Sequence, residues 1–153
     1  DKIHNQYMLL KDALNADFDD TPYYEKTMKT IADFKERHGK LRFAVGEILN
    51  ADAIELALML VKEGFEVKSV FATIGELNFS FLKALAKLSP NTKIYSNLSP
   101  TMITYEPDEI DCYIGSDCLY YFEGKPGIEW CEDNQPFGFE SVCRLFNELD
   151  KVL

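Results

Sequence analysis

The feature that most constrains the fold is a regular alternation of short apolar, β-rich runs with helical segments. The first run, LRFAVGEI at 41–48, is followed by a helix that has Asn50 or Asp52 as its N-cap and ends at Gly64. The same pattern predicts further strands at 67–75, 92–98, 111–117 and 127–133, a helix at 78–90 capped by Asn78, and a closing helix from about Phe139. Parallel strands need long, usually helical connections. The sequence therefore predicts a doubly wound, mainly parallel α/β fold of Rossmann type, with four to five strands and helices on both faces.

The chain has 153 residues, enough for one compact domain with its own core. Residues 1–40 are expected to form a helical lead-in, and 41–153 the α/β domain. In the lead-in, Thr21 as the cap, Pro22 at the first position and Gly39 as the terminator predict one long helix. Because the chain begins with aspartate, we expect a processed protein or a piece of a longer one.

The helix expected after the first strand is apolar on nearly every side. Across 54–61 the only charged residue is Glu55. A helix that covers a sheet needs a single apolar stripe, so this one is expected to be buried on two sides. Either neighbouring helices of the same domain cover the second side, or a partner domain or subunit does.

Charge and composition exclude several classes of function. The net charge is −10, and no stretch gathers Lys and Arg with aromatic residues, so nucleic acid is not expected as a partner. Neither a membrane-length apolar run nor a signal-peptide pattern occurs, which favours a cytoplasmic location without membrane contact. The two histidines, His4 and His38, do not form a credible base for a nucleophile.

Ligands of open parallel sheets bind outside the carboxyl ends of the strands. No glycine-rich phosphate loop follows any predicted strand, so a dinucleotide or nucleotide is disfavoured. The expected strand ends, which also include Gly75, are rich in carboxylates and predict an acidic crevice. The alternative to a binding role is that Asp52 and Asp117 only accept hydrogen bonds from backbone N–H groups. The candidate cavity-lining residues are Gly46, Glu47, Gly115, Ser116, Asp117, Glu132 and Asp133.

The four cysteines are spaced C-x5-C-x12-C-x11-C, which contains no zinc knuckle and no self-contained iron–sulfur motif. No metal ligand is therefore assigned. Cys112 and Cys143 are expected in the core, where a thiol packs as a small apolar group. Cys118 and Cys131 follow their strands and are the thiols expected to be exposed near the crevice.

An ordered set of motifs resembles the last Rossmann-like domain of nitrogenase component 1 type oxidoreductases. These include the molybdenum–iron protein subunits, their cofactor-scaffold relatives and the protochlorophyllide reductase subunits. The motifs are Gly46-Glu47, the helix from Asp52 to Gly64, Ile114-Gly115 and the closing turn Pro136-Phe137-Gly138-Phe139-Glu140. The resemblance runs from about Thr21 to the end of the chain.

The resemblance implies a C-terminal domain that forms part of a metal-cofactor or substrate cavity and is not catalytic alone. It implies an iron–sulfur or metal cluster in the full-length parent, with no cofactor held by this chain. The implied partners are other domains of the parent chain, a homologous subunit and an ATP-dependent iron–sulfur reductase protein. One departure is that the family's cofactor-ligating histidine in the closing turn is missing, because Phe137 is followed directly by Gly138.

Two other hypotheses fit the same residues. One is a stand-alone α/β module, regulatory or binding, whose acidic crevice takes a small polar ligand or a cation. The other is an interaction domain in which the apolar helix at 54–61 holds an oligomer together.

Overall fold

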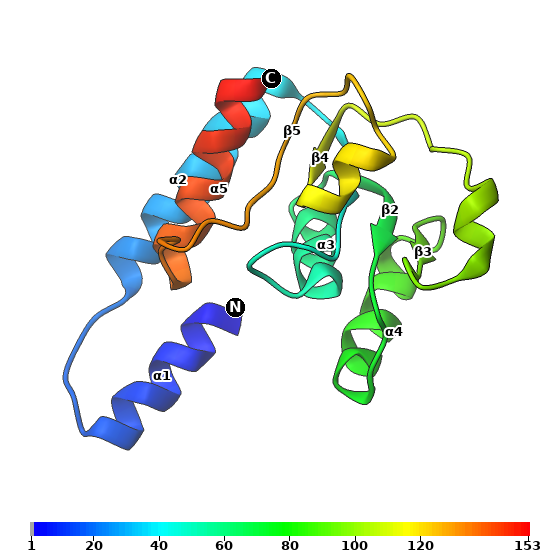
Figure 1. Ribbon diagram of the computed structural model, residues 1–153. Helices are drawn as coiled ribbons and strands as arrows, with labels where there is room; N and C mark the ends of the chain where they lie inside the picture. Colours follow the sequence, from blue (N-terminus) through cyan, green and yellow to red (C-terminus); the bar gives the residue numbers. More distant parts are fainter. Residues whose placement is uncertain (1) are drawn as a thin grey trace.

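The computed structural model describes residues 2–153 and is built on a five-stranded, wholly parallel sheet in the order β3-β2-β1-β4-β5 (Figure 1). After β3 the chain returns to the far side of β1, so the strand order reverses between β1 and β4. This confirms the predicted doubly wound, parallel α/β fold. The strands are β1 (Arg42–Val45), β2 (Glu66–Phe71), β3 (Lys93–Tyr95), β4 (Cys112–Ile114) and β5 (Gly127–Ile128).

Within residues 2–153, five α-helices and three short 3-10 helices accompany the sheet. In Figure 1, α2 and α5 lie side by side, while α1 projects from the body of the molecule and touches it mainly through its first turns. They are α1 (Lys2–Leu14), α2 (Thr21–His38), α3 (Ala53–Lys62), α4 (Phe79–Leu88), α5 (Gly138–Val152), η1 (Glu76–Asn78), η2 (Pro100–Thr104) and η3 (Ser116–Tyr120). Within residues 2–153, no helix has the length and apolar character needed to cross a membrane.

Side-chain alternation along the strands gives the sheet two different faces. Phe43 and Val45 point into a large core shared with α2, α3, α4 and α5, while Ala44 between them belongs to a smaller core on the opposite face. That second face is covered by η2, η3 and the segments around them. It is rich in aromatic residues, and Phe71 stacks on Tyr121 with ring centroids 4.6 Å apart.

Most of the predicted helix ends are correct. Gly39 ends α2 with φ +69, and Asp52 caps α3 by accepting a hydrogen bond from the Glu55 N–H at 2.9 Å. Thr21 is not the cap of α2 but its first helical residue, because the carboxylate of Asp19 accepts its N–H.

Asn78 does not cap α4 through its side chain. It ends the 3-10 turn η1, and its Oδ1 accepts the Gly75 N–H at 3.0 Å instead. The strands are also shorter than predicted, and β5 is reduced to two residues because the chain after Ile128 leaves the sheet.

Helix α3 was expected to be buried on two sides, and elements of the same chain provide this burial. Ile54, Ala57 and Leu60 are fully or almost fully buried, and Leu58 on the other side is only 7% exposed. The helix packs on β2 and α4, and its remaining side faces α2 and α5 across a groove. Neighbouring elements of the same chain therefore account for the buried residues of α3, while its groove-facing side stays partly open.

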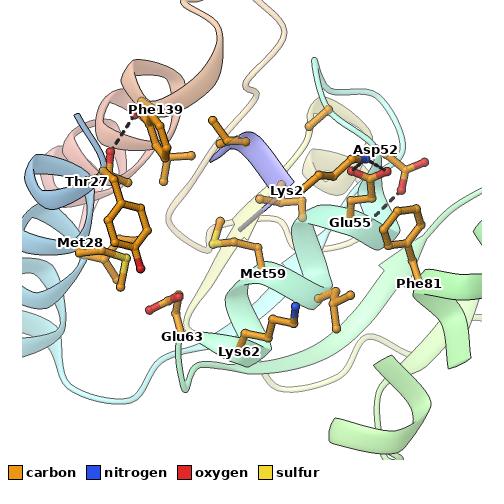
Figure 2. A pocket seen from close by; sticks show the side chains of 17 residues that line it. Lys2, Thr27, Met28, Asp52, Glu55, Met59, Lys62, Glu63, Phe81 and Phe139 are labelled. Atoms are coloured by element: carbon orange, nitrogen blue, oxygen red, sulfur yellow. Dashed lines mark hydrogen bonds and ion pairs between the residues drawn. The ribbon is translucent and has the colours of Figure 1, made fainter. Parts of the chain in front are cut away.

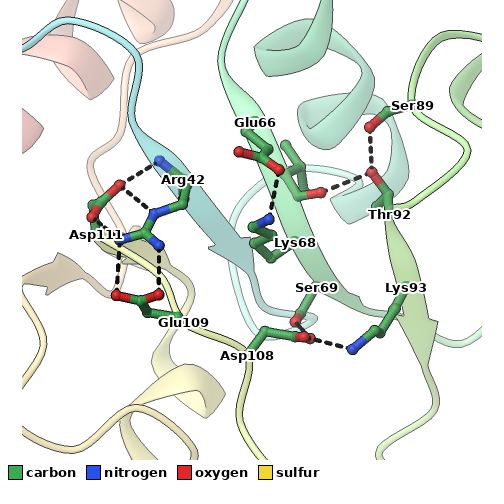
Figure 3. A network of polar contacts seen from close by, with 11 residues as sticks. Arg42, Glu66, Lys68, Ser69, Ser89, Thr92, Lys93, Asp108, Glu109 and Asp111 are labelled. Atoms are coloured by element: carbon green, nitrogen blue, oxygen red, sulfur yellow. Dashed lines mark hydrogen bonds and ion pairs between the residues drawn. The ribbon is translucent and has the colours of Figure 1, made fainter.

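Charged residues hold together the amino-terminal edge of the sheet, opposite the candidate site (Figure 3). Arg42 at the start of β1 donates to both carboxylate oxygens of Asp111 and forms an ion pair with Glu109. These hydrogen bonds lower the pKa of Asp111 and of Glu109. Nearby, Asp108 accepts hydrogen bonds from Ser69 of β2 at 2.8 Å and from Lys93 of β3. The carboxylates before β4 thereby tie β1, β2 and β3 together.

Candidate functional site

The loops after β1 and β4 approach each other closely at two glycines. A Cβ on Gly115 would lie 2.7 Å from the Gly46 Cα, and a Cβ on Gly46 would lie 2.1 Å from the Asp117 Oδ1. Gly115 also has φ +122, a conformation that side-chain-bearing residues avoid. Both positions therefore require glycine, and the two loops meet at the point where the strand order reverses.

Asp117 is a buried carboxylate that fixes the loop after β1. Its Oδ2 accepts the Glu47 N–H at 3.0 Å and its Oδ1 accepts the Ile48 N–H at 3.1 Å. It also accepts a hydrogen bond from the Asn97 side-chain amide at 2.9 Å. The expectation that Asp117 and Asp52 serve backbone N–H groups is thus observed, for Asp117 on a loop and for Asp52 at a helix start.

Glu47 extends this arrangement to the loop after β2. Its Oε1 accepts the Thr73 N–H at 2.7 Å, and its Oε2 accepts from the same Asn97 amide at 3.2 Å. Tyr121, at the end of η3, donates to the Asn97 Oδ1 at 3.0 Å. One network therefore joins the loops that follow β1, β2, β3 and β4.

Two side chains of this network, those of Asn97 and Tyr121, were not among the predicted site residues. Asn97 stands at a predicted strand end, which was a usable signal. Tyr121 had none, because its position depends on how η3 turns back toward β3.

The other candidate residues lie around this network. Ser116 is bonded to the loop after β1, since its N–H and its hydroxyl both donate to the Ile48 carbonyl. Glu132 is exposed and pairs with Arg144 of α5, and Asp133 is exposed with no hydrogen bond among the described residues. The structure therefore brings together the five candidates that follow β1 and β4, and leaves the two that follow β5 outside the network.

One prediction about the cysteines is wrong. Cys118 was expected to be exposed, but it is fully buried because η3 folds it back beneath the sheet, and this burial raises its pKa. Cys112 and Cys143 are buried as predicted, and burial raises the pKa of Cys112 to about 12. Cys131 is exposed.

These residues do not fit the ligand set of a metal cluster. In residues 2–153, no three His, Cys, Asp or Glu side chains converge as a metal site would require. The histidines take structural hydrogen bonds, His4 with Asp20 and His38 with Asp150, both at 2.7 Å.

Large apolar side chains are exposed on the loops at the carboxyl ends of all five strands. Leu77 after β2, Tyr120 after β4 and Phe137 after β5 are each at least 86% exposed. We call this set the apolar rim; it comprises Ile48, Ile74, Leu77, Leu98, Ile103, Tyr120 and Phe137. When exposed apolar side chains lie together at one edge of a domain, that edge is often a contact surface.

A comparison with solved structures finds nitrogenase Cp1 at pH 6.5, with a TM-score of 0.73 over 98% of this chain and 14% sequence identity. This chain shares the fold of part of that nitrogenase. It spans 37% of the length of the nitrogenase chain. No protein-family model and no curated protein sequence matches the chain.

Proposed function

We propose that the chain is the C-terminal domain of a nitrogenase-like, component 1 type oxidoreductase. In this proposal its strand-end loops form part of a cavity, for a metal cofactor or a substrate, that other domains complete. The observation that carries it is the fold shared with a nitrogenase over 98% of this chain, which amounts to 37% of that longer chain.

The structure of the strand-end loops supports the proposal that they form one wall of a cavity. The network around Asp117 and Asn97 fixes four loops in place, and the apolar rim lies on the same edge. A rigid, partly apolar edge suits contact with companion domains better than it suits capture of a small polar ligand. Two of the carboxylates that motivated the stand-alone module, Glu47 and Asp117, are engaged by neighbouring loops.

Under this proposal the cluster ligands reside elsewhere in the parent. The parent takes electrons from an ATP-dependent iron–sulfur reductase protein and pairs with a homologous subunit. In this proposal the chain alone is not catalytic and contributes shape and contacts; within residues 2–153 no three His, Cys, Asp or Glu side chains gather as a metal site would require.

The test is to read the gene upstream of residue 1, and to measure iron in the full gene product and in this chain. We expect a reading frame that continues upstream with cysteine-bearing domains, iron in the full product, and no stoichiometric iron in this chain. A reading frame that starts at residue 1, or a full product without iron, would refute the proposal.

A further inference from the structure

An apolar groove lies between α3 on one side and α2 with α5 on the other (Figure 2). Its volume is about 610 Å³, within the range of pockets that bind ligands. Met28 of α2 and Met59 of α3 reach into it from opposite walls, and Phe139 of α5 lines it. Methionine side chains adapt to varied apolar partners, so these walls suit a side-chain stripe rather than one rigid ligand.

The α3 side of the groove is acidic. Asp52, Glu55 and Glu63 line it against a single lysine of the same helix, Lys62. The whole chain also carries a charge of −10, so this local charge adds to an overall negative field. A partner for this surface therefore needs positive charge beside its apolar contacts.

Helix α1 shows in part what the groove accepts. Lys2 pairs with Glu55 and lies over the ring of Phe81 at 4.8 Å, while Ile3 lines the groove beside it. Tyr7 then touches Phe139, with ring centroids 5.4 Å apart.

Beyond these first turns α1 leaves the groove. Leu9 and Leu14 are 69% and 71% exposed, and α1 contains no buried residue. The helix is basic, with Lys2 and Lys11 against Asp12. A basic amphipathic helix is thus seated at the mouth of the groove through its first turns only, and most of the groove stays open.

We propose that this groove receives a second basic amphipathic helix, supplied by another domain of the parent chain, with lysine or arginine beside an apolar stripe. The inference rests on the proposed function for the source of the helix, since this chain spans 37% of the longer chain whose fold it shares. The chemistry of the helix follows from the groove itself. Lys2 competes with that helix for Glu55, so α1 moderates its binding.

The experiment titrates this whole chain with a fluorescent peptide of leucine and lysine, LKKLLKLLKKLLKL, as a mimic of such a helix. A peptide with glutamate in place of every lysine is the control. We expect saturable 1:1 binding of the lysine peptide alone, because charge and apolar stripe must both match. Met59→Glu and Glu55→Lys should each weaken it about tenfold.

Glu76→Lys is the matched control, because Glu76 is exposed at the strand-end edge and its substitution changes the charge equally. It should change the affinity less than about twofold. Lys2→Ala should strengthen binding, since it frees Glu55; far-UV circular dichroism confirms that each variant is folded. Equal losses in Glu55→Lys and Glu76→Lys, binding of the glutamate peptide, or no binding at all would overturn the proposal.

Sedimentation of this chain alone decides whether a second copy fills the groove. A dimer that Met59→Glu dissociates would overturn the proposed source. Peptide binding and iron content are separate readouts. A groove that binds the peptide in a protein whose gene starts at residue 1 would refute the proposed function and leave the groove's chemistry standing.

Discussion

Two aspartates show how single residues hold opposite edges of the sheet. At the carboxyl edge, Asp117 is buried and accepts three hydrogen bonds from neighbouring loops. At the amino edge, Asp111 accepts hydrogen bonds from the backbone N–H and the guanidinium of Arg42. Both carboxylates accept hydrogen bonds from groups far away in the sequence, so periodicity did not predict which groups would pair.

Asp111 makes the stability of the protein depend on pH in a defined direction. Hydrogen bonding to Arg42 lowers its pKa below the usual 3.8. Its contribution is therefore complete above that value and is lost as the pH falls below it. Asp111→Asn should lower the free energy of unfolding by about 1 kcal/mol at neutral pH and by less near about pH 3.

Urea unfolding of the parent and of Asp111→Asn at both pH values measures this difference. Asp133→Asn, which removes an exposed carboxylate, serves as the control and should have little effect at either pH. A difference for Asp111→Asn that stays constant between the two pH values would contradict the linkage.

At the scale of elements, the glycine pair after β1 and β4 limits which loops are compatible with the fold. Gly115→Ala would place a Cβ 2.7 Å from the Gly46 Cα and 2.9 Å from its nitrogen, both backbone atoms that cannot rotate away. We expect a loss of about 1–3 kcal/mol in the free energy of unfolding. Chemical denaturation followed by circular dichroism measures it.

Gly124→Ala separates crowding from backbone strain. Gly124 also has a positive φ, +77, but nothing lies within 4 Å of its added Cβ. This variant should lose only the strain of the left-handed conformation, about 1 kcal/mol. If Gly124→Ala costs as much as Gly115→Ala, the close approach of the two loops is not what requires glycine.

The elements themselves were largely predictable, and their side-chain contacts were not. Glycines and N-cap residues begin or end helices through local interactions, so Gly39 and Asp52 predicted helix ends correctly. The strand order and the network around Asp117 and Asn97 depend on contacts between distant segments, and the periodicity of the sequence does not predict such contacts. Cys118 shows the difference: it follows its strand as predicted, but a 3-10 turn buries it.

At the scale of the whole molecule, two surface properties act against each other. The apolar rim favours association, while a net charge of −10 on each molecule opposes it. Added salt screens the repulsion between molecules, because the Debye length falls to about 3 Å at 1 M, but it does not weaken apolar contacts. The protein alone should therefore be monomeric at low salt and associate as salt is added.

Light scattering across a salt series tests this balance, with Leu98→Ser/Tyr120→Ser as the rim variant. Leu98 and Tyr120 are 81% and 86% exposed, so their loss should leave stability nearly unchanged while it suppresses association. Leu9→Ser removes a similarly exposed leucine from α1 and should leave association intact. If Leu9→Ser suppresses association instead, the surface that associates lies on α1. The strand-end edge would then not be the contact surface that we propose.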